Sequence, residues 1–189
     1  ADIKTFQAFG VYGAAVITAV VAENTTGVQG IFPIPPEFVS LQIRSVLDDI
    51  GADAVKLGML FDEGIIGAVA GELRKYRPSN IVVDPVMMAK NGDPLLKPEA
   101  RDALVEQIFP LAAVVTPNLN EAEALSGGRI ETDTDLGEAL RTIRSKGPRS
   151  VLIKGGHYGE DAVDYFYAVE EIGRAHACTP VTSVNLASR

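Results

Sequence analysis

Cysteine is nearly absent from the sequence. Its 189 residues include one cysteine, Cys178, and no tryptophan. A single thiol cannot form an internal disulfide, so a disulfide-stapled fold is excluded, and a reducing cytoplasm is the compartment that we expect. A chain of this length can bury roughly 70% of its unfolded surface without such staples. The composition therefore predicts one globular domain.

Clusters of positive charge and long apolar runs are also missing. The net charge is −8 at pH 7, whereas affinity for nucleic acids and anionic membranes depends on clustered Lys and Arg. The longest predominantly apolar run, residues 14–22, is too short to cross a bilayer. We therefore expect neither a nucleic acid nor a membrane as a partner.

Two common nucleotide-binding motifs do not occur. The sequence contains neither G-x-x-x-x-G-K-[ST] nor G-x-G-x-x-G. A P-loop that cradles phosphates is thus excluded, and a dinucleotide-dependent dehydrogenase has no support.

Apolar runs alternate with helix-like segments along the chain. The composition and spacing predict strands at 14–22, 54–59, 81–84, 112–116 and 150–154, with the first of them continuously apolar and buried. They predict helices at 2–9, 36–50, 63–73, 98–109, 119–125 and 133–146. An alternation about every thirty residues is typical of a parallel sheet covered by helices on both faces.

Charged side chains follow the carboxyl ends of the predicted strands, where α/β proteins bind their ligands. Asp84 and Glu121 supply oxygen atoms of the kind that Mg²⁺ uses together with water and phosphates. Lys154 precedes two glycines whose N–H groups could approach an anion, which suits a phosphate. The alternatives are a turn cap for Asp84, a helix-dipole carboxylate for Glu121 and a solvated strand end for Lys154.

Six short motifs occur along the chain. They are Asp2-Ile-Lys-Thr-Phe6, Ile17-Thr-Ala19 with Asn24-Thr25, Val55-Lys-Leu-Gly-Met59, Val83-Asp-Pro-Val-Met87, Thr116-Pro-Asn118 with Glu121-Ala122, and Lys154-Gly-Gly-His157. In this order they resemble the hydroxymethylpyrimidine/phosphomethylpyrimidine kinases of thiamine biosynthesis, over residues 1 to about 170. The resemblance implies a ribokinase-like α/β fold, a three-layer sandwich with a mostly parallel central sheet.

The same resemblance implies an activity and its cofactors. These kinases use ATP and Mg²⁺ to phosphorylate 4-amino-5-hydroxymethyl-2-methylpyrimidine and then its monophosphate, and the family suggests a homodimer. By resemblance, the pyrimidine site would be lined by Asp2, Glu23, Met59 and Val86.

The resemblance also assigns the phosphate side of the site. Asp84 and Glu121 would organise Mg²⁺ through water, and Asn118 and Lys154 would face the ATP phosphates. Lys154 and Asp84 would be the catalytic residues. Phosphoryl transfer asks a protein mainly for positioning and for neutralisation of charge, which such residues supply.

The chain departs from the family in three places. The family's glycine-rich segment before the residue that matches Asp2, and its later Gly-Thr-Gly-Cys segment, do not occur in the printed sequence. We therefore expect residues 1–170 to be a partial kinase domain that is inactive by itself. The third departure is Glu23, because the family usually carries Gln at that position.

Residues 171–182 are different in character. They show neither helix nor strand periodicity, and they resemble one reading frame of a common sequencing adapter. We therefore expect residues 171–189 to be a non-native tail, in which His176 and Cys178 have no function.

Two other functions stay open. A close relative of the family, such as a pyridoxal kinase, would share most of the motifs. A non-catalytic α/β domain that binds a small ligand would explain the missing segments.

The first prediction concerns Glu23. If the pocket takes the aminopyrimidine, Glu23→Gln in the full-length protein should bind it as well as the original or better. An amide both donates and accepts hydrogen bonds, whereas an ionised carboxylate only accepts them. Calorimetric titration measures the affinity, and a loss of more than tenfold, about 1.4 kcal/mol, would mean that another substrate is selected.

Overall fold

The computed structural model describes residues 2–88, 94–155 and 163–168, and the backbone of 171–176. His157 and Cys178 lie outside the described residues, as does the side chain of His176. In the described part of the chain, no helix is both long enough and apolar enough to span a membrane.

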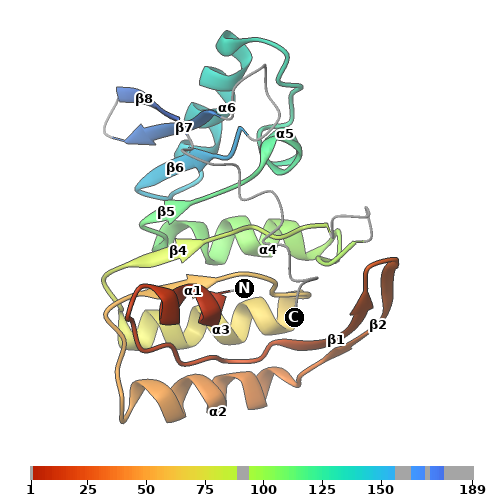
Figure 1. Cartoon of the computed structure of the whole chain (residues 1–189), viewed down its shortest axis with the longest axis vertical. Coiled ribbons are helices and arrows are strands. Elements are labelled where there is room, and N and C mark those ends of the chain that lie inside the picture. Colours follow the sequence, from red (N-terminus) through yellow and green to blue (C-terminus); the bar gives the residue numbers. More distant parts are fainter. Residues whose placement is uncertain (1, 89–93, 156–162, 169–170, 177–189) are drawn as a thin grey trace.

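A six-stranded sheet forms the centre of the structure (Figure 1). Its strands lie in chain order: β3 (Val55–Leu57), β4 (Ile81–Val83), β5 (Val114–Val115), β6 (Ser150–Ile153), β7 (Val163–Ala168) and β8 (Glu171–His176). The first four are parallel, and β7 and β8 are antiparallel to their neighbours. The predicted mostly parallel sheet is thus confirmed.

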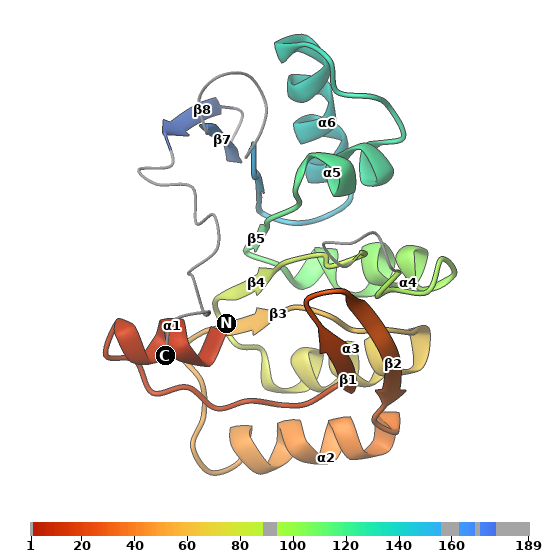
Figure 2. The ribbon, with the colours of Figure 1, turned by 45° about the vertical axis from the view of Figure 1, so that its right-hand side comes forward.

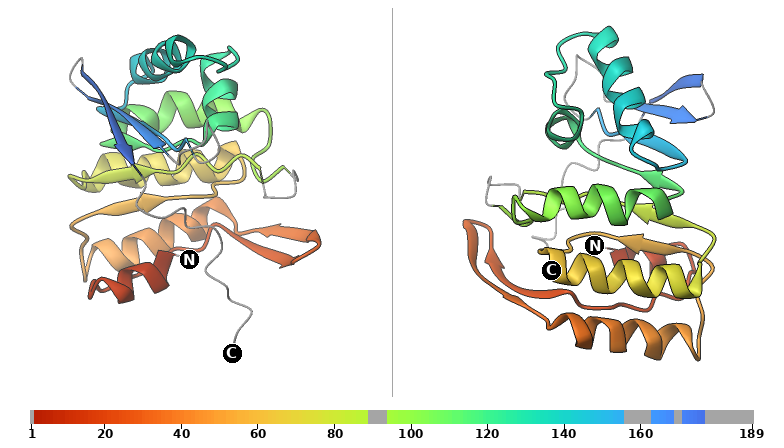
Figure 3. Two further views of the ribbon diagram at one scale, coloured as in Figure 1. Left: turned by 45° about the horizontal axis from the view of Figure 1, so that its top comes forward. Right: turned by 180° about the vertical axis from the view of Figure 1, so that it is seen from behind.

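Helices cover one face of this sheet along its length. They are α2 (Pro36–Leu47), α3 (Glu63–Tyr76), α4 (Ala100–Gln107) and α6 (Asp133–Ser145), which all lie on the near side in the right-hand view of Figure 3. The short elements η1 (Phe109–Leu111) and α5 (Leu119–Ser126) pack on α4 and α6. Helix α1 (Asp2–Ala8) lies on the opposite face, beside β3 (Figure 2).

The two faces of the sheet differ in burial. Successive residues of a strand point to opposite faces, so the strand register aligns Leu57, Val83, Val115 and Val151 in one buried row toward the helices. The other face carries side chains that are only half-buried, including Lys56, Val82 and Val114. The core therefore lies between the sheet and the helical layer.

Residues 14–22 do not form the predicted buried strand. Instead, β1 (Ala19–Asn24) pairs antiparallel with β2 (Gly27–Pro33) in a separate hairpin. Asn24 Oδ1 accepts hydrogen bonds from the backbone N–H of Thr26 at 2.9 Å and from its hydroxyl at 2.6 Å. This side-chain turn reverses the chain locally, and the apolar run gave no sign of it.

The segment before the hairpin is extended without a neighbouring strand. The carboxamide of Gln42 accepts from the N–H of Ile17 and donates to its carbonyl, both at 3.0 Å. The hydroxyl of Thr18 donates to the carbonyl of Met59 at 2.7 Å. Side chains thus provide the hydrogen bonds that a strand partner would otherwise supply.

Strand β8 is a second difference from the sequence-based expectation. Residues 171–182 show no strand periodicity, yet Glu171–His176 pairs with β7 over its whole length. Antiparallel pairing uses backbone groups, so it does not require an alternating side-chain pattern. Whether residues 171–189 are native to the protein stays a prediction.

An ion pair joins α2 to α3 and generates the second prediction. Glu72 is 5% exposed, and Arg44 donates to its Oε1 from Nε at 2.9 Å and from Nη2 at 2.6 Å. The Arg44 guanidinium holds the pKa of the Glu72 carboxyl below its usual value, against the opposing effect of burial. The pair therefore stabilises the fold above the unfolded pKa of about 4.5, and that contribution is lost as the pH falls through the lower folded value.

Arg44→Met should lower the midpoint of thermal unfolding at pH 7 by about 3–6 °C, because it leaves a buried carboxylate unpaired. The deficit should shrink as the pH falls below the unfolded pKa of about 4.5 and Glu72 becomes protonated. Arg129→Met, which removes an exposed partner of Glu131, is the matched control and should change little. A deficit that does not depend on pH would contradict this account.

Candidate active site

The candidate site is a row of charged side chains at the carboxyl ends of the parallel strands. Lys56 of β3 is in register with Val82 of β4. Asp84 follows Val82 by two residues, so the side chains of Lys56 and Asp84 point to the same face of the sheet, the one that carries α1. A further parallel bridge pairs Asn118 with Lys154 just beyond β5 and β6. Register alone therefore brings residues that are 98 positions apart, 56 and 154, to one edge of one face.

The charges in this row alternate in sign. Lys154 Nζ donates to Asp84 Oδ1 at 2.7 Å, and Lys56 Nζ lies 3.8 Å from Asp84 Oδ2. Lys56 Nζ also donates to Asp2 Oδ2, at the start of α1, at 2.9 Å. Two lysines and two aspartates, from α1, β3 and the ends of β4 and β6, thus form a continuous chain.

Glu121 caps α5. Its Oε2 accepts from the N–H of Asn118 at 2.8 Å, and Asn118 Oδ1 accepts from the N–H of Glu121 at 2.9 Å. This reciprocal arrangement is a capping box. The Glu121 carboxylate thus has a structural role in capping α5. The alternative role considered from the sequence, a favourable interaction with the helix dipole, did not include these hydrogen bonds.

Burial also changes the chemistry of Glu121. The side chain is 7% exposed, and this burial raises the pKa of its carboxyl. The N–H of Asn118 and the ammonium of Lys154 oppose the rise, while the Asp84 carboxylate adds to it. Glu121 is therefore linked electrostatically to the charged row, although no hydrogen bond joins them within the described residues.

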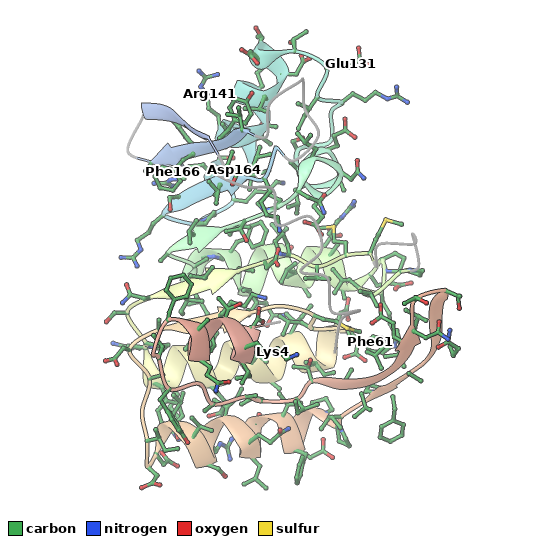
Figure 4. The ribbon with its side chains drawn as sticks, viewed as in Figure 1. Lys4, Phe61, Glu131, Arg141, Asp164 and Phe166 are labelled. Atoms are coloured by element: carbon green, nitrogen blue, oxygen red, sulfur yellow. The ribbon has the colours of Figure 1, made fainter. Side chains whose placement is uncertain are left out.

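The turn after Lys154 was predicted to offer its glycine N–H groups to an anion, but the N–H of Gly155 has a partner within the protein. The N–H of Gly155 donates to Asp164 Oδ1 of β7 at 3.1 Å, so the fold already uses a donor that was expected to face an anion. A side chain at Gly155 would collide with the carbonyl oxygen of Val163, so glycine is required here by the close approach of β7. Figure 4 labels Asp164 at this position. Gly156 lies outside the described residues.

The proposed pyrimidine-lining residues are only partly brought together. Asp2 reaches the charged row through Lys56. Met59 and Val86 are half-buried at the ends of β3 and β4, and the N–H of Val86 donates to the carbonyl of Asp84 at 2.8 Å. Glu23 is exposed near the tip of the hairpin, and in the described structure no hydrogen bond or ion pair joins it to the row.

Beyond Met59 the backbone is locally unusual. Phe61 has a φ of 62°, which is rare for an aromatic residue. Its carbonyl accepts from the N–H of Lys97 at 3.0 Å, and the Lys97 ammonium lies 5.0 Å from the centre of its ring. Figure 4 shows Phe61 where the chain leaves β3 for α3.

The carboxylates at the row suit one kind of metal site. Among the described residues, no three His, Cys, Asp or Glu side chains gather into a metal-binding group. Mg²⁺ bound with phosphates needs only one or two carboxylates, with water and phosphate as the other ligands. Asp84 and Glu121 fit that requirement, and they do not fit a cation enclosed by protein ligands alone.

A groove elsewhere on the surface is a weaker candidate. It has a volume of about 390 Å³ between α4 and α5, and Arg101, Asp102 and Lys146 are among its lining residues. Arg101 Nε lies 3.8 Å from Asp102 Oδ1, so the two charges partly neutralise each other. The strand-end row has the larger set of converging charges.

Sequence reasoning missed Lys56. The residue was assigned to a strand, and its alternation with Val55 and Leu57 was the available signal that it points away from the core. Its two carboxylate partners come from residues 2 and 84, which only the fold brings together.

Most of the chain is similar to known kinases. The family model described as phosphomethylpyrimidine kinase matches residues 1–183. The hydroxymethylpyrimidine/phosphomethylpyrimidine kinase of Escherichia coli is 44% identical over 172 residues. That match covers 90% of this chain and 65% of the relative, so the chain spans slightly less than two thirds of the relative's length.

Solved structures agree with the sequence matches. A phosphomethylpyrimidine kinase from Clostridium difficile superposes with a TM-score of 0.85 at 41% identity, over 93% of this chain and 76% of that one. A Staphylococcus aureus pyridoxal kinase in complex with AMP-PCP and pyridoxal superposes with a TM-score of 0.81 at 34% identity, over 92% and 63% of the two chains. The predicted ribokinase-like fold is therefore confirmed.

The third prediction separates the structural role of Glu121 from a chemical one. Glu121→Ala should reduce the free energy of unfolding by about 1–2 kcal/mol, because it leaves a backbone donor of the capping box unpaired. Glu121→Gln should stay within about 0.5 kcal/mol of the original, because Gln also completes a capping box. Urea unfolding measures both, with the exposed Glu138→Ala as control.

Equal losses in the Ala and Gln variants would mean that the negative charge, rather than the cap, stabilises α5. In that case the capping assignment would be wrong.

Proposed function

This chain belongs to the phosphomethylpyrimidine kinase family, and on that basis we propose that the full-length protein phosphorylates 4-amino-5-hydroxymethyl-2-methylpyrimidine and its monophosphate with ATP. The observation that carries the proposal is the ion pair of Lys154 with Asp84 at the carboxyl edge of the parallel strands. The pathway would be thiamine biosynthesis, and the location the cytoplasm.

Each side of the site has a proposed role. Asp84 and Glu121 would hold Mg²⁺ through water, and Asn118 and Lys154 would bind the ATP phosphates. Bound Mg²⁺ would supply neutralisation of phosphate charge. The pyrimidine would lie against Asp2, Met59 and Val86, with Glu23 accepting from its exocyclic amino group.

In the first phosphorylation, the substrate's hydroxymethyl oxygen forms a bond to the γ-phosphorus, the bond from that phosphorus to the bridging oxygen breaks, ADP leaves and the hydroxyl proton passes to solvent. In the second, a phosphate oxygen of the monophosphate is the acceptor. Lys154 would turn from Asp84 toward the γ-phosphate, where its charge stabilises the transferring group. Asp84 is 24% exposed and Lys154 39% exposed at the side chain, so both can change partners without unpacking the core. The chain's own contribution is then position and charge.

Other features of the proposal concern the protein as a whole. We propose residues 1–170 as part of the kinase domain and residues 171–189 as a non-native tail. A homodimer is consistent with the exposed apolar side chains of the first fifty residues, which include Phe9, Tyr12, Phe32, Phe38 and Leu41.

A pyridoxal kinase-like enzyme is the second candidate. It is supported by the similarity to the pyridoxal kinase of S. aureus. Competition between pyridoxal and the aminopyrimidine for phosphorylation by the full-length protein distinguishes the two. A domain that binds ligand without turnover would show neither product.

The fourth prediction tests the charged pair. Asp84→Asn and Lys154→Ala in the full-length enzyme should each lower kcat by about a hundredfold, because each removes charge stabilisation at the transferring group. Binding of the pyrimidine without nucleotide should stay near that of the original, as measured by calorimetry. Asp49→Asn and Lys4→Ala, both at exposed positions, are the matched controls. Unchanged turnover in either site variant would refute the assignment.

A further inference from the structure

Lys56 has no role in the function proposed above, yet it occupies the middle of the charged row. It projects from β3, and its side chain is 27% exposed. It lies between Asp2, which is assigned to the pyrimidine, and Asp84, which is assigned to the metal. Its ammonium is 2.9 Å from Asp2 Oδ2 and 3.8 Å from Asp84 Oδ2.

The neighbouring Gly58 lies beside the ammonium of Lys56. A Cβ built on Gly58 would lie 3.4 Å from Lys56 Nζ, so the lysine side chain runs along β3 over Gly58 toward the carboxyl end of the strand. A larger side chain at Gly58 would occupy the space that the ammonium uses. The sequence Lys56-Leu-Gly58 therefore supplies both the cation and its path.

Asp84 shares its two oxygens between two lysines. Lys154 donates to Oδ1 at 2.7 Å, and Lys56 faces Oδ2. When Lys154 turns toward a phosphate, Lys56 is the cation of the row that continues to face Asp84. Without it, Asp2 and Asp84 would be two carboxylates with no positive charge between them, and their mutual repulsion would displace both.

We propose that Lys56 is a positioning residue that holds Asp2 and Asp84 in fixed relative positions and so couples the pyrimidine side of the site to its phosphate side. This inference rests on the proposed kinase function. Lys56 touches neither reacting group, and it acts through the two carboxylates.

The test is Lys56→Met in the full-length protein, which removes the charge and keeps most of the apolar stem. We expect kcat to fall at least tenfold and the affinity for the pyrimidine without nucleotide to weaken about tenfold, because misplacement of a positioned group is costly. The KM for ATP and the far-ultraviolet circular dichroism should stay near those of the original protein. Lys56→Arg should recover part of both losses, because it restores the cation.

Two further variants complete the design. Lys4→Met removes an exposed lysine from α1, the helix that carries Asp2, and should leave turnover unchanged; Figure 4 labels this residue. Gly58→Val keeps the lysine but fills its path, so it should lower kcat and pyrimidine affinity in the same direction as Lys56→Met. This variant carries the test if Lys56→Met does not fold.

The outcomes separate the two levels of the proposal. A wild-type protein that phosphorylates no pyrimidine would overturn the proposed function, and the role of Lys56 with it. An active wild type with normal kinetics in Lys56→Met and Gly58→Val would overturn only the role of Lys56. Loss of kcat and pyrimidine affinity with partial rescue by Arg would support it.

Discussion

The carboxylate of Asp84 is held between two ammonium groups, and the geometry of the candidate site depends on that arrangement. Lys154 approaches one oxygen and Lys56 the other. The three residues come from different strands, so the arrangement exists only if β3, β4, β5 and β6 are parallel and in their observed register. A slip of one residue in β3, β4 or β6 would turn its charged side chain toward the apolar core. Packing of the buried face therefore also determines where the charges lie.

Glu121 connects the same site to the stability of a helix. Its carboxylate completes the cap of α5 with Asn118, and both residues are assigned to the phosphate side of the site. A backbone cap fixes the position of a carboxylate without any contribution from a ligand. The raised pKa of this carboxyl reflects its burial, and the Asp84 carboxylate adds to the rise. One local motif thus caps α5 and fixes the position of a buried carboxyl group.

The sequence predicted the parallel part of the fold well because β4 and β5 are compact β-branched runs and several helices have clear starts. Asp62 caps α3 and Pro36 begins α2, both at predicted positions. The prediction of a buried strand at 14–22 was wrong, because an apolar run does not reveal whether a strand joins the main sheet or pairs in a local hairpin. The N–H of Gly155 was assigned to an anion because its actual partner, Asp164, comes from a strand that was not predicted. Lys56 was missed for a related reason, since its partners are 54 and 28 residues away.

The division of the sheet into two unlike faces explains how a short set of strands can serve both folding and chemistry. On the helical side, Val83, Val115 and Val151 are at most 1% exposed, and they provide apolar burial. On the other side, β3 presents Lys56, and β4 and β6 lead to Asp84 and Lys154, which stay partly solvated. A charged residue on the first face would carry a large desolvation cost, whereas the charged groups on the second face keep partial access to water. Strand alternation satisfies both requirements at once, so the site can change its charged residues without disturbing the core that aligns them.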